Sequence, residues 1–190
     1  MRSLRPRRPL IGLTMIELII TLTIGAILLA LAVPSMREYI ARKRVTGTAT
    51  ELAADVRLAR SMVQQQNQPI WITFRLTTDY SCYAMYTEGD GNDQCDCSRT
   101  PMCGAFDPDG PIVLRSVFIK RNTGITITSF GENLQYTKPV GAPVPWWGGT
   151  AEAEVDGGAL GGRVKVIMTG LTKARICSLS GHTAEFGNCS

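Results

Sequence analysis

The sequence predicts an α+β protein in which one long N-terminal helix precedes an antiparallel β-sheet. The first third of the chain is apolar and then amphipathic with helical spacing. The remainder alternates apolar and polar residues over short runs, which glycine and proline separate. A helix followed by consecutive strands, rather than alternating with them, is typical of this fold class.

The first element is an apolar run from Leu13 to Val33 that contains one acid, Glu17. Its 21 residues would form a helix of about 31 Å, which is enough to cross the hydrocarbon core of a bilayer. A lone carboxylate inside such a span costs about 2.5–3.5 kcal/mol on the insertion scale. Glu17 therefore requires an explanation.

Two interpretations of the apolar run leave its acid unexplained. A secretory signal peptide cut after the small residues at 30–32 would start the mature chain at Val33. The run is longer than the usual apolar region of about 7–15 residues, and it carries a charge. An uncleaved single-pass anchor accounts for the length but gives Glu17 no partner.

A third interpretation, which we favour, explains the carboxylate. The residues "GLTMIE" from Gly12 to Glu17 resemble the class III signal of type IV pilins and type II secretion pseudopilins. The resemblance implies that a prepilin peptidase cuts between Gly12 and Leu13 and methylates Leu13. It also implies that Glu17 pairs with the N-terminal amine of a neighbouring filament subunit, because two opposite buried charges cost less together than apart. Pro34 matches the helix-kinking proline of that family.

The formal net charge of +4 belongs to the predicted leader. The chain has 20 basic and 16 acidic residues, and the first eleven residues contain four arginines and no acid. The remaining 16 basic residues balance the acids, so the charge does not indicate an anionic partner for the body. The leader arginines should stay in the cytoplasm; they are Arg2, Arg5, Arg7 and Arg8.

An amphipathic stripe continues the helix beyond the apolar run. Apolar residues recur at steps of four and three, Gly47 is a weak point, and Pro69 ends the pattern. The stripe comprises Val45, Ala49, Leu52, Val56, Ala59 and Val63. The predicted organisation is a leader at 1–12, a membrane-spanning or filament-core helix at 13–34, an amphipathic continuation at 35–67, and a β-rich head at 68–190 that contains the disulfides.

Alternating residues predict the strands of the head. Residues 70–76 alternate strictly, 82–87, 112–119 and 124–130 are further candidates, and 163–168 with 173–179 form a closing hairpin. The stretch 131–162 is rich in glycine and proline, and we interpret it as a long surface loop. Its Trp146 and Trp147 would contact another subunit or cover the sheet edge.

The passage from helix to first strand carries a second resemblance. The segment "LAADVRLARSMVQQQNQPIWITF" is similar to the minor-pilin family that includes FimT, FimU and GspH. The resemblance implies a filament subunit anchored in the inner membrane, with its head in the periplasm and other pilins or pseudopilins as partners. A minor pilin of a type IV pilus is the first hypothesis. The alternatives are a GspH-like pseudopilin of type II secretion and a competence pilin that binds DNA.

Six cysteines, all in the head, predict disulfides in an oxidising compartment. The family resemblance implies a pair between Cys177 and Cys189, which closes a C-terminal loop. Cys95 and Cys97 are too close to pair comfortably, so each should meet Cys82 or Cys103. A zinc site in "CDCSRTPMC" is less favoured, because thiolate ligands are rare in such a compartment.

The sequence favours a protein without catalytic activity or cofactor. The single histidine, His182, could be paired with Cys177 as base and nucleophile, but no third group is suggested to orient them. The acidic segment "EGDGNDQCD" lacks the EF-hand pattern, and we predict a solvated loop rather than a metal site.

The closing hairpin offers a possible DNA contact. If both apolar faces meet the core, paired residue numbers sum to an even number, and four basic residues share the outer face. A solvated face is the favoured interpretation, because the DNA-binding pilins carry a Gly-Arg-x-Arg motif after the last strand, where this chain has Gly181-His182-Thr183-Ala184. The four basic residues are Arg163, Lys165, Lys173 and Arg175.

The two cleavage hypotheses predict different mature proteins. We expect the intact mass of the chain purified from membranes to correspond to residues 13–190 with one added methyl group, because the class III signal explains Glu17. A chain that begins at Val33 would contradict this prediction and indicate an ordinary signal peptide.

Overall fold

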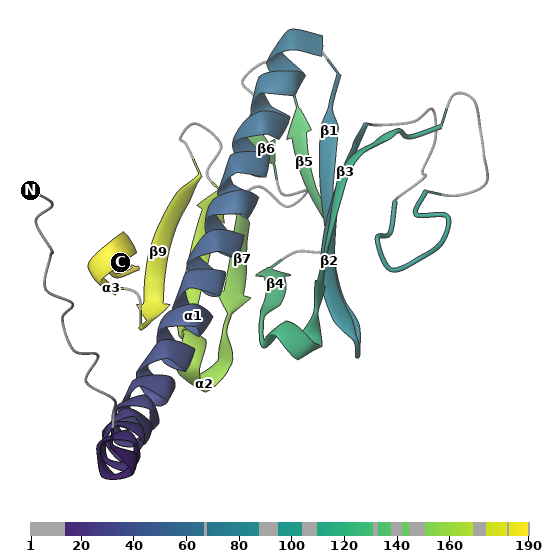
Figure 1. Ribbon diagram of the computed structural model, residues 1–190. Helices are drawn as coiled ribbons and strands as arrows, with labels where there is room; N and C mark the ends of the chain where they lie inside the picture. Colours follow the sequence, from purple (N-terminus) through teal and green to yellow (C-terminus); the bar gives the residue numbers. More distant parts are fainter. Residues whose placement is uncertain are drawn as a thin grey trace, which may run out of the picture. The chain divides into compact units, whose positions relative to one another are not determined.

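The computed structural model describes residues 14–66, 68–87, 95–103, 110–130, 133–137, 142–144, 151–168, 174–181 and 183–189. The chain divides into two compact units, Met1–Arg37 and Glu38–Ser190. One helix, α1 (Met15–Gln66), runs from the first unit into the second. Two antiparallel sheets follow it (Figure 1), which confirms the predicted α+β class.

The second half of α1 buries the predicted apolar stripe. The helix continues through Gly47 and ends at Gln66, and the first strand begins one residue after Pro69. All six stripe residues, from Val45 to Val63, are at most 4% exposed. This burial follows from the helical spacing, which places residues three and four apart on one face.

The first sheet has the strand order β3-β2-β1-β5-β6, and all its pairs are antiparallel. On β1 the alternating residues Ile70, Ile72 and Phe74 are buried, whereas Leu76 at the strand end is half exposed. The strands are β1 (Ile70–Leu76), β2 (Tyr80–Thr87), β3 (Val113–Lys120), β5 (Asn133–Thr137) and β6 (Ala142–Val144).

The second sheet has the order β4-β7-β8-β9 and is also antiparallel. Its strands are β4 (Thr126–Phe130), β7 (Ala151–Asp156), β8 (Arg163–Met168) and β9 (Arg175–Ser180). Three short helical turns complete the described fold: η1 (Arg121–Thr123), α2 (Gly158–Gly161) and α3 (Thr183–Phe186).

The interpretation of residues 131–162 as a long loop is wrong. The stretch contains β5, β6, β7 and α2. In β7 the buried residues Ala151, Ala153 and Val155 alternate with acids. The two alanines are small, and the glycines and prolines on either side dominate the local composition. Trp146 and Trp147 lie outside the described residues.

One core joins α1 to both sheets. It includes Leu52 and Val56 of α1, Ile72 of β1, and Ile127 and Val166 of the second sheet. The sheets are also linked by a hydrogen bond in which the Ile127 N–H donates to Ser81 Oγ at 3.0 Å. Because β2 carries Ser81, this bond joins the two sheets directly.

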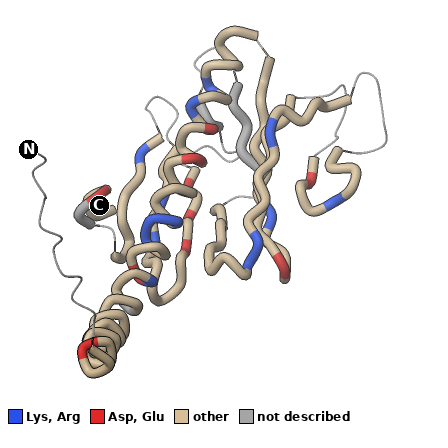
Figure 2. Tube along the Cα trace, in the orientation of Figure 1, with Lys and Arg blue, Asp and Glu red and all other residues tan. Residues whose placement is uncertain are grey.

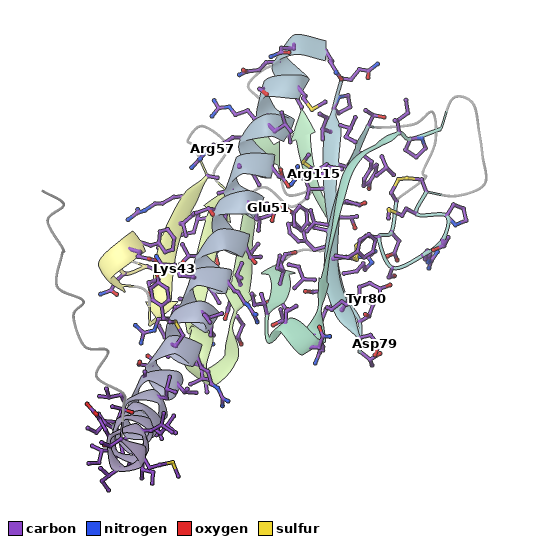
Figure 3. The ribbon with its side chains drawn as sticks, in the orientation of Figure 1. Lys43, Glu51, Arg57, Asp79, Tyr80 and Arg115 are labelled. Atoms are coloured by element: carbon purple, nitrogen blue, oxygen red, sulfur yellow. A yellow bond between two sulfur atoms is a disulfide. The ribbon has the colours of Figure 1, made fainter. Side chains whose placement is uncertain are left out.

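A partly buried polar network connects α1 to β2 and β3. The hydroxyl of Tyr83 donates to Asp55 Oδ2 at 2.7 Å, and Arg115 Nε lies 2.8 Å from the same oxygen. Arg115 also donates to Glu51 at 2.7 Å (Figure 3). Burial and then the Asp55 hydrogen bond raise the pKa of Tyr83, so the phenol remains a donor. The charge of Asp55 raises the pKa of Arg115. The buried carboxylate of Asp55 is thereby paired and hydrogen-bonded.

We expect Tyr83→Phe to lower the free energy of unfolding by about 1.5–3 kcal/mol, because it removes a buried hydrogen bond to a charged group. Urea denaturation of the full chain in detergent micelles measures the change. Tyr80→Phe is the matched control, because the Tyr80 hydroxyl makes a long 3.4 Å bond to the Ser98 carbonyl at a partly exposed position. Equal losses for the two variants would contradict the assigned role of the network.

Candidate assembly helix and the contacts that hold it

The first half of α1 presents large apolar side chains to its surroundings. This helix is long and apolar enough to cross a membrane, with a mean hydropathy of 2.5 over a stretch of which none is buried. Between Met15 and Val33 the only charged residue is Glu17. The exposed side chains are Met15, Ile16, Leu18, Ile19, Ile20, Leu22, Ile24, Ile27, Leu28, Leu29, Leu31 and Val33.

Glu17 lies in the first turn of α1, and Thr14 precedes that turn as its cap. The N–H of Glu17 donates to Thr14 Oγ1 at 3.3 Å and to the Thr14 carbonyl at 3.1 Å. The order Thr-x-x-Glu is a capping pattern, and an acid in the first turn faces the positive end of the helix dipole. The sequence analysis missed the role of Thr14. Gly12 and Leu13 lie outside the described residues, and Pro34 lies within the continuous helix.

Four consecutive residues of α1, Lys43–Thr46, contact three separate segments of the head. Glu185 of α3 accepts hydrogen bonds from Lys43 Nζ and Thr46 Oγ1, each at 2.6 Å. Arg44 donates to the Thr123 carbonyl of η1 at 3.3 Å. We call these three segments, η1, α2 and α3, the collar; Figure 3 labels Lys43 on the side of α1 near α3. The hydrogen bond to Glu185 and its charge raise the pKa of Lys43.

The third collar contact is a close approach of α2 to the helix. A Cβ at Gly157 would collide with Val45 Cγ2, and one at Gly161 would lie 3.2 Å from that atom. Gly161 is also near the Ala41 carbonyl. The turn between β7 and β8 therefore requires glycine at position 157, whereas a side chain at position 161 would make a tight contact with Val45.

The C-terminal segment that carries Glu185 is closed by a disulfide. Cys177 of β9 pairs with Cys189, which is the pair that the family resemblance implies. The Ser178 N–H donates to the Gly187 carbonyl at 2.7 Å, and the Cys189 N–H donates to the Ser178 carbonyl at 3.1 Å. Cys177 is therefore unavailable as a nucleophile, and His182 lies outside the described residues.

The other two disulfides cover the outer face of the first sheet. Cys97 pairs with Cys82, and Cys95 pairs with Cys103. These are the two partners that the sequence analysis considered for the closely spaced cysteines. Cys82 and Cys97 are buried together with Ala84 of β2.

Asp96 is engaged by protein groups beside these disulfides. Its carboxylate accepts from Arg75 at 3.1 Å and from the main chain and side chain of Ser98. Partial burial alone would raise the pKa of Asp96, but the Ser98 and Arg75 hydrogen bonds outweigh it and lower the pKa. Asp90, Asn92 and Asp93 lie outside the described residues, and among those described no cluster of His, Cys, Asp or Glu suits a metal ion.

Over most of β8, the closing hairpin pairs in the register that places the apolar residues of both strands on the core face, as the sequence analysis expects. From Val164 to Ile167 the paired numbers are even in sum, as for Val164 with Ser178 and Val166 with Ile176. A register shift next to Val164 pairs Arg163 with Ser180, so the even sum does not extend to Arg163. Val164, Val166 and Met168 are buried, and Arg163 and Lys165 belong to the opposite face.

The basic residues of β8 are paired with acids of β7. Lys165 Nζ lies 2.7 Å from Glu152 Oε2, and Arg163 lies 3.4 Å from Glu154 Oε1. Figure 2 colours the acidic positions of the chain red and the basic positions blue. Arg175 is exposed at the start of β9, and Lys173 lies outside the described residues. The described part of the stripe is therefore largely neutralised within its own sheet.

Comparison with protein families matches residues 48–170 to the family described as type II transport protein GspH. The chain belongs to the GspH family. Among solved structures it is similar to the crystal structure of the type IV minor pilin FimU of Pseudomonas aeruginosa strain PAO1. The two are 18% identical, with a TM-score of 0.47, and the match covers 75% of this chain and 92% of that one. No curated protein matches the chain.

Membership of the GspH family makes the chain a minor pilin or pseudopilin, a class of structural subunits that associate with other pilins. The family match begins at residue 48 and ends at residue 170. It includes η1 and α2 of the collar but neither Lys43 nor Glu185. The apolar half of α1 and the closed C-terminal segment also lie outside it, so their roles are argued from this chain alone.

The C-terminal disulfide should hold α3 against α1. We expect the double variant Cys177→Ser, Cys189→Ser to expose the C-terminal segment to limited proteolysis, because only local hydrogen bonds would then position Glu185. Mass spectrometry of the digested full chain locates the cuts. The matched control, Cys82→Ser with Cys97→Ser, should leave the C-terminal segment protected, and protection in both double variants would contradict the prediction.

Proposed function

We propose that this member of the GspH family is a non-catalytic minor pilin of a type IV pilus. In this proposal a prepilin peptidase cuts after Gly12 and methylates Leu13. The first half of α1 then anchors the chain in the inner membrane, with the head in the periplasm. The subunit later joins the filament or its priming tip complex. The exposed apolar surface between Met15 and Val33 carries the proposal.

An apolar helical surface of this extent requires an apolar environment. Burying it in lipid or among other helices contributes about 25 cal/mol per Å². None of the most apolar stretch is buried in this structure. From Val45 onward, by contrast, one face of the helix packs into the core that it shares with the two sheets. This division supports a helix whose first half serves membrane anchoring and then assembly.

Glu17 has a specific task in this proposal. Among packed helices in a low-dielectric environment, an unpaired carboxylate is costly, whereas one paired with an amine is not. The methylated N-terminus at Leu13 of a neighbouring subunit supplies that amine. Thr14 supports the arrangement by capping the same turn, which fixes the backbone from which the Glu17 side chain extends.

A pseudopilin of the type II secretion system is the second candidate function. The description of the matching family, type II transport protein GspH, favours it. Both candidates use α1 in the same way and differ in the subunits that surround it. DNA binding in competence is not proposed, because Arg163 and Lys165 are paired with Glu154 and Glu152.

Photo-crosslinking in cells tests the assembly role of α1. We expect a photoreactive residue in place of Leu22, which is 66% exposed, to capture other pilin-like subunits. Glu17→Leu should remove these crosslinks while the chain remains in the membrane, because the helix becomes more apolar but loses its charge partner. Glu17→Asp, which keeps the charge, is the matched control and should retain them in part.

The identity of the captured subunit distinguishes the two machines. A major pilin and other minor pilins indicate a type IV pilus, whereas a major pseudopilin indicates type II secretion. Crosslinks that persist unchanged in Glu17→Leu would contradict the role of the carboxylate. Absence of any captured pilin-like subunit would contradict the proposed function.

A further inference from the structure

Strand β3 forms an open edge of the first sheet. It pairs with β2 on one side, and within the described ranges no strand pairs with its other side. Its eight residues are exposed or only partly buried, whereas seven of the eight residues in β2 are buried. Phe118 is 48% exposed although it lies within the strand. A long, partly apolar edge that no described strand covers is suited to pairing with another strand.

A groove runs between this edge and α1. Its volume is about 760 Å³. The wall on α1 is formed by Arg44, Gly47, Thr48 and Glu51, which lie on one face of the helix. The opposite wall and floor are Phe118, Ile119, Lys120, Asn122, Thr123 and Ile125.

Gly47 leaves space on the helix side of the groove. A Cβ at this position would have no neighbouring atom within 4 Å. Glycine in a helix interior costs about 1 kcal/mol relative to alanine, and no close packing requires it here. A side chain at position 47 would therefore extend into open space beside the groove, which makes the position suitable for blocking it.

The groove is bordered by positive charge. Arg44 and Lys120 line it, and Arg121 follows directly in η1. The one acid in its lining, Glu51, is ion-paired with Arg115 at 2.7 Å. Asp79 is the neighbouring acid in the β1–β2 turn, where its carbonyl accepts from the Arg121 N–H. Among the described residues that line the groove, Arg44 and Lys120 are therefore the basic ones that are not ion-paired with Glu51.

We propose that the groove beside β3 binds an extended acidic segment of a neighbouring filament subunit, which adds to the edge of the sheet. The main chain of the segment would pair with β3, one apolar side chain would enter the groove above Ile119 and Ile125, and its carboxylates would meet Arg44 and Lys120. Specificity then comes from the groove and the charges, while the paired main chain supplies affinity. The identity of the partner as a filament subunit rests on the proposed function.

Charge selects this occupant over a second copy of the chain. Two β3 strands paired with each other would add a second Lys120 and a second Arg121 to the same interface, and like charges across an interface are unfavourable. An acidic segment instead complements them. Its approach to Lys120 requires no rearrangement of the Glu51–Arg115 pair.

Two photoreactive probes in the full-length chain test this inference in cells. One replaces Asn122, which is exposed and lines the groove. The other replaces Leu22 and reports helix assembly independently. We expect the Asn122 probe to capture a peptide that is rich in Asp or Glu, from another pilin-like subunit.

Three variants show whether the capture uses the groove. Gly47→Trp should reduce the yield of the crosslink from position 122 about tenfold, because the new side chain fills the groove. A reduction of that size is what the loss of one specific contact would cause. Ala54→Trp, on the same exposed face two turns further along, is the matched control and should have no effect. Lys120→Glu should also reduce the crosslink, and exchanging one captured acid for lysine should restore it.

Each outcome decides the inference. No Asn122 crosslink, a captured peptide without acids, or capture of β3 from a second copy would overturn it. Equal effects of Gly47→Trp and Ala54→Trp would do the same. If the Leu22 probe captures subunits while the Asn122 probe does not, the proposed assembly function stands and the groove inference fails. If neither captures a subunit, both fail.

Discussion

The structure depends on a single helix that meets two environments along its length. The half of α1 up to Arg37 exposes its apolar residues, and the half from Glu38 buries one stripe against two sheets. Since none of the most apolar stretch of the first half is buried, that half must find its apolar surroundings elsewhere. The head therefore has to hold a helix that other molecules also bind, and its features can be understood from that requirement.

Apolar burial alone would not fix how α1 sits on the sheets, because it is non-directional. The stripe contains many residues of similar size, such as Val45, Val56 and Val63, which provide little registration along the axis. The directional contacts are the hydrogen bonds of Lys43–Thr46 to the collar and the pairing of Asp55 with Tyr83 and Arg115. They lie about three turns apart on α1, so together they fix both rotation and axial position.

Sequence reasoning succeeded where large apolar residues set the period, as in α1, β1 and the closing hairpin. It failed at β7, where two of the three inward residues are alanines and the flanking glycines suggested a loop. That failure had a consequence for the candidate site, because β7 also supplies Glu152 and Glu154. Without them the stripe on β8 looked like free positive charge. Thr14 was missed for a different reason: its Thr-x-x-Glu pattern overlaps the segment that was interpreted as a processing signal.

One residue, Arg44, takes part both in holding α1 on the head and in forming the groove. Arg44 donates to Thr123 in η1 and also lines the groove, so the contact that helps seat α1 also positions the end of the groove. A substitution of Arg44 would disturb both and could not separate their roles. Gly47 and Lys120 line the groove, whereas Lys43 donates to Glu185 and does not line the groove. Partner binding at the edge of β3 can therefore be altered while the helix stays attached to the head.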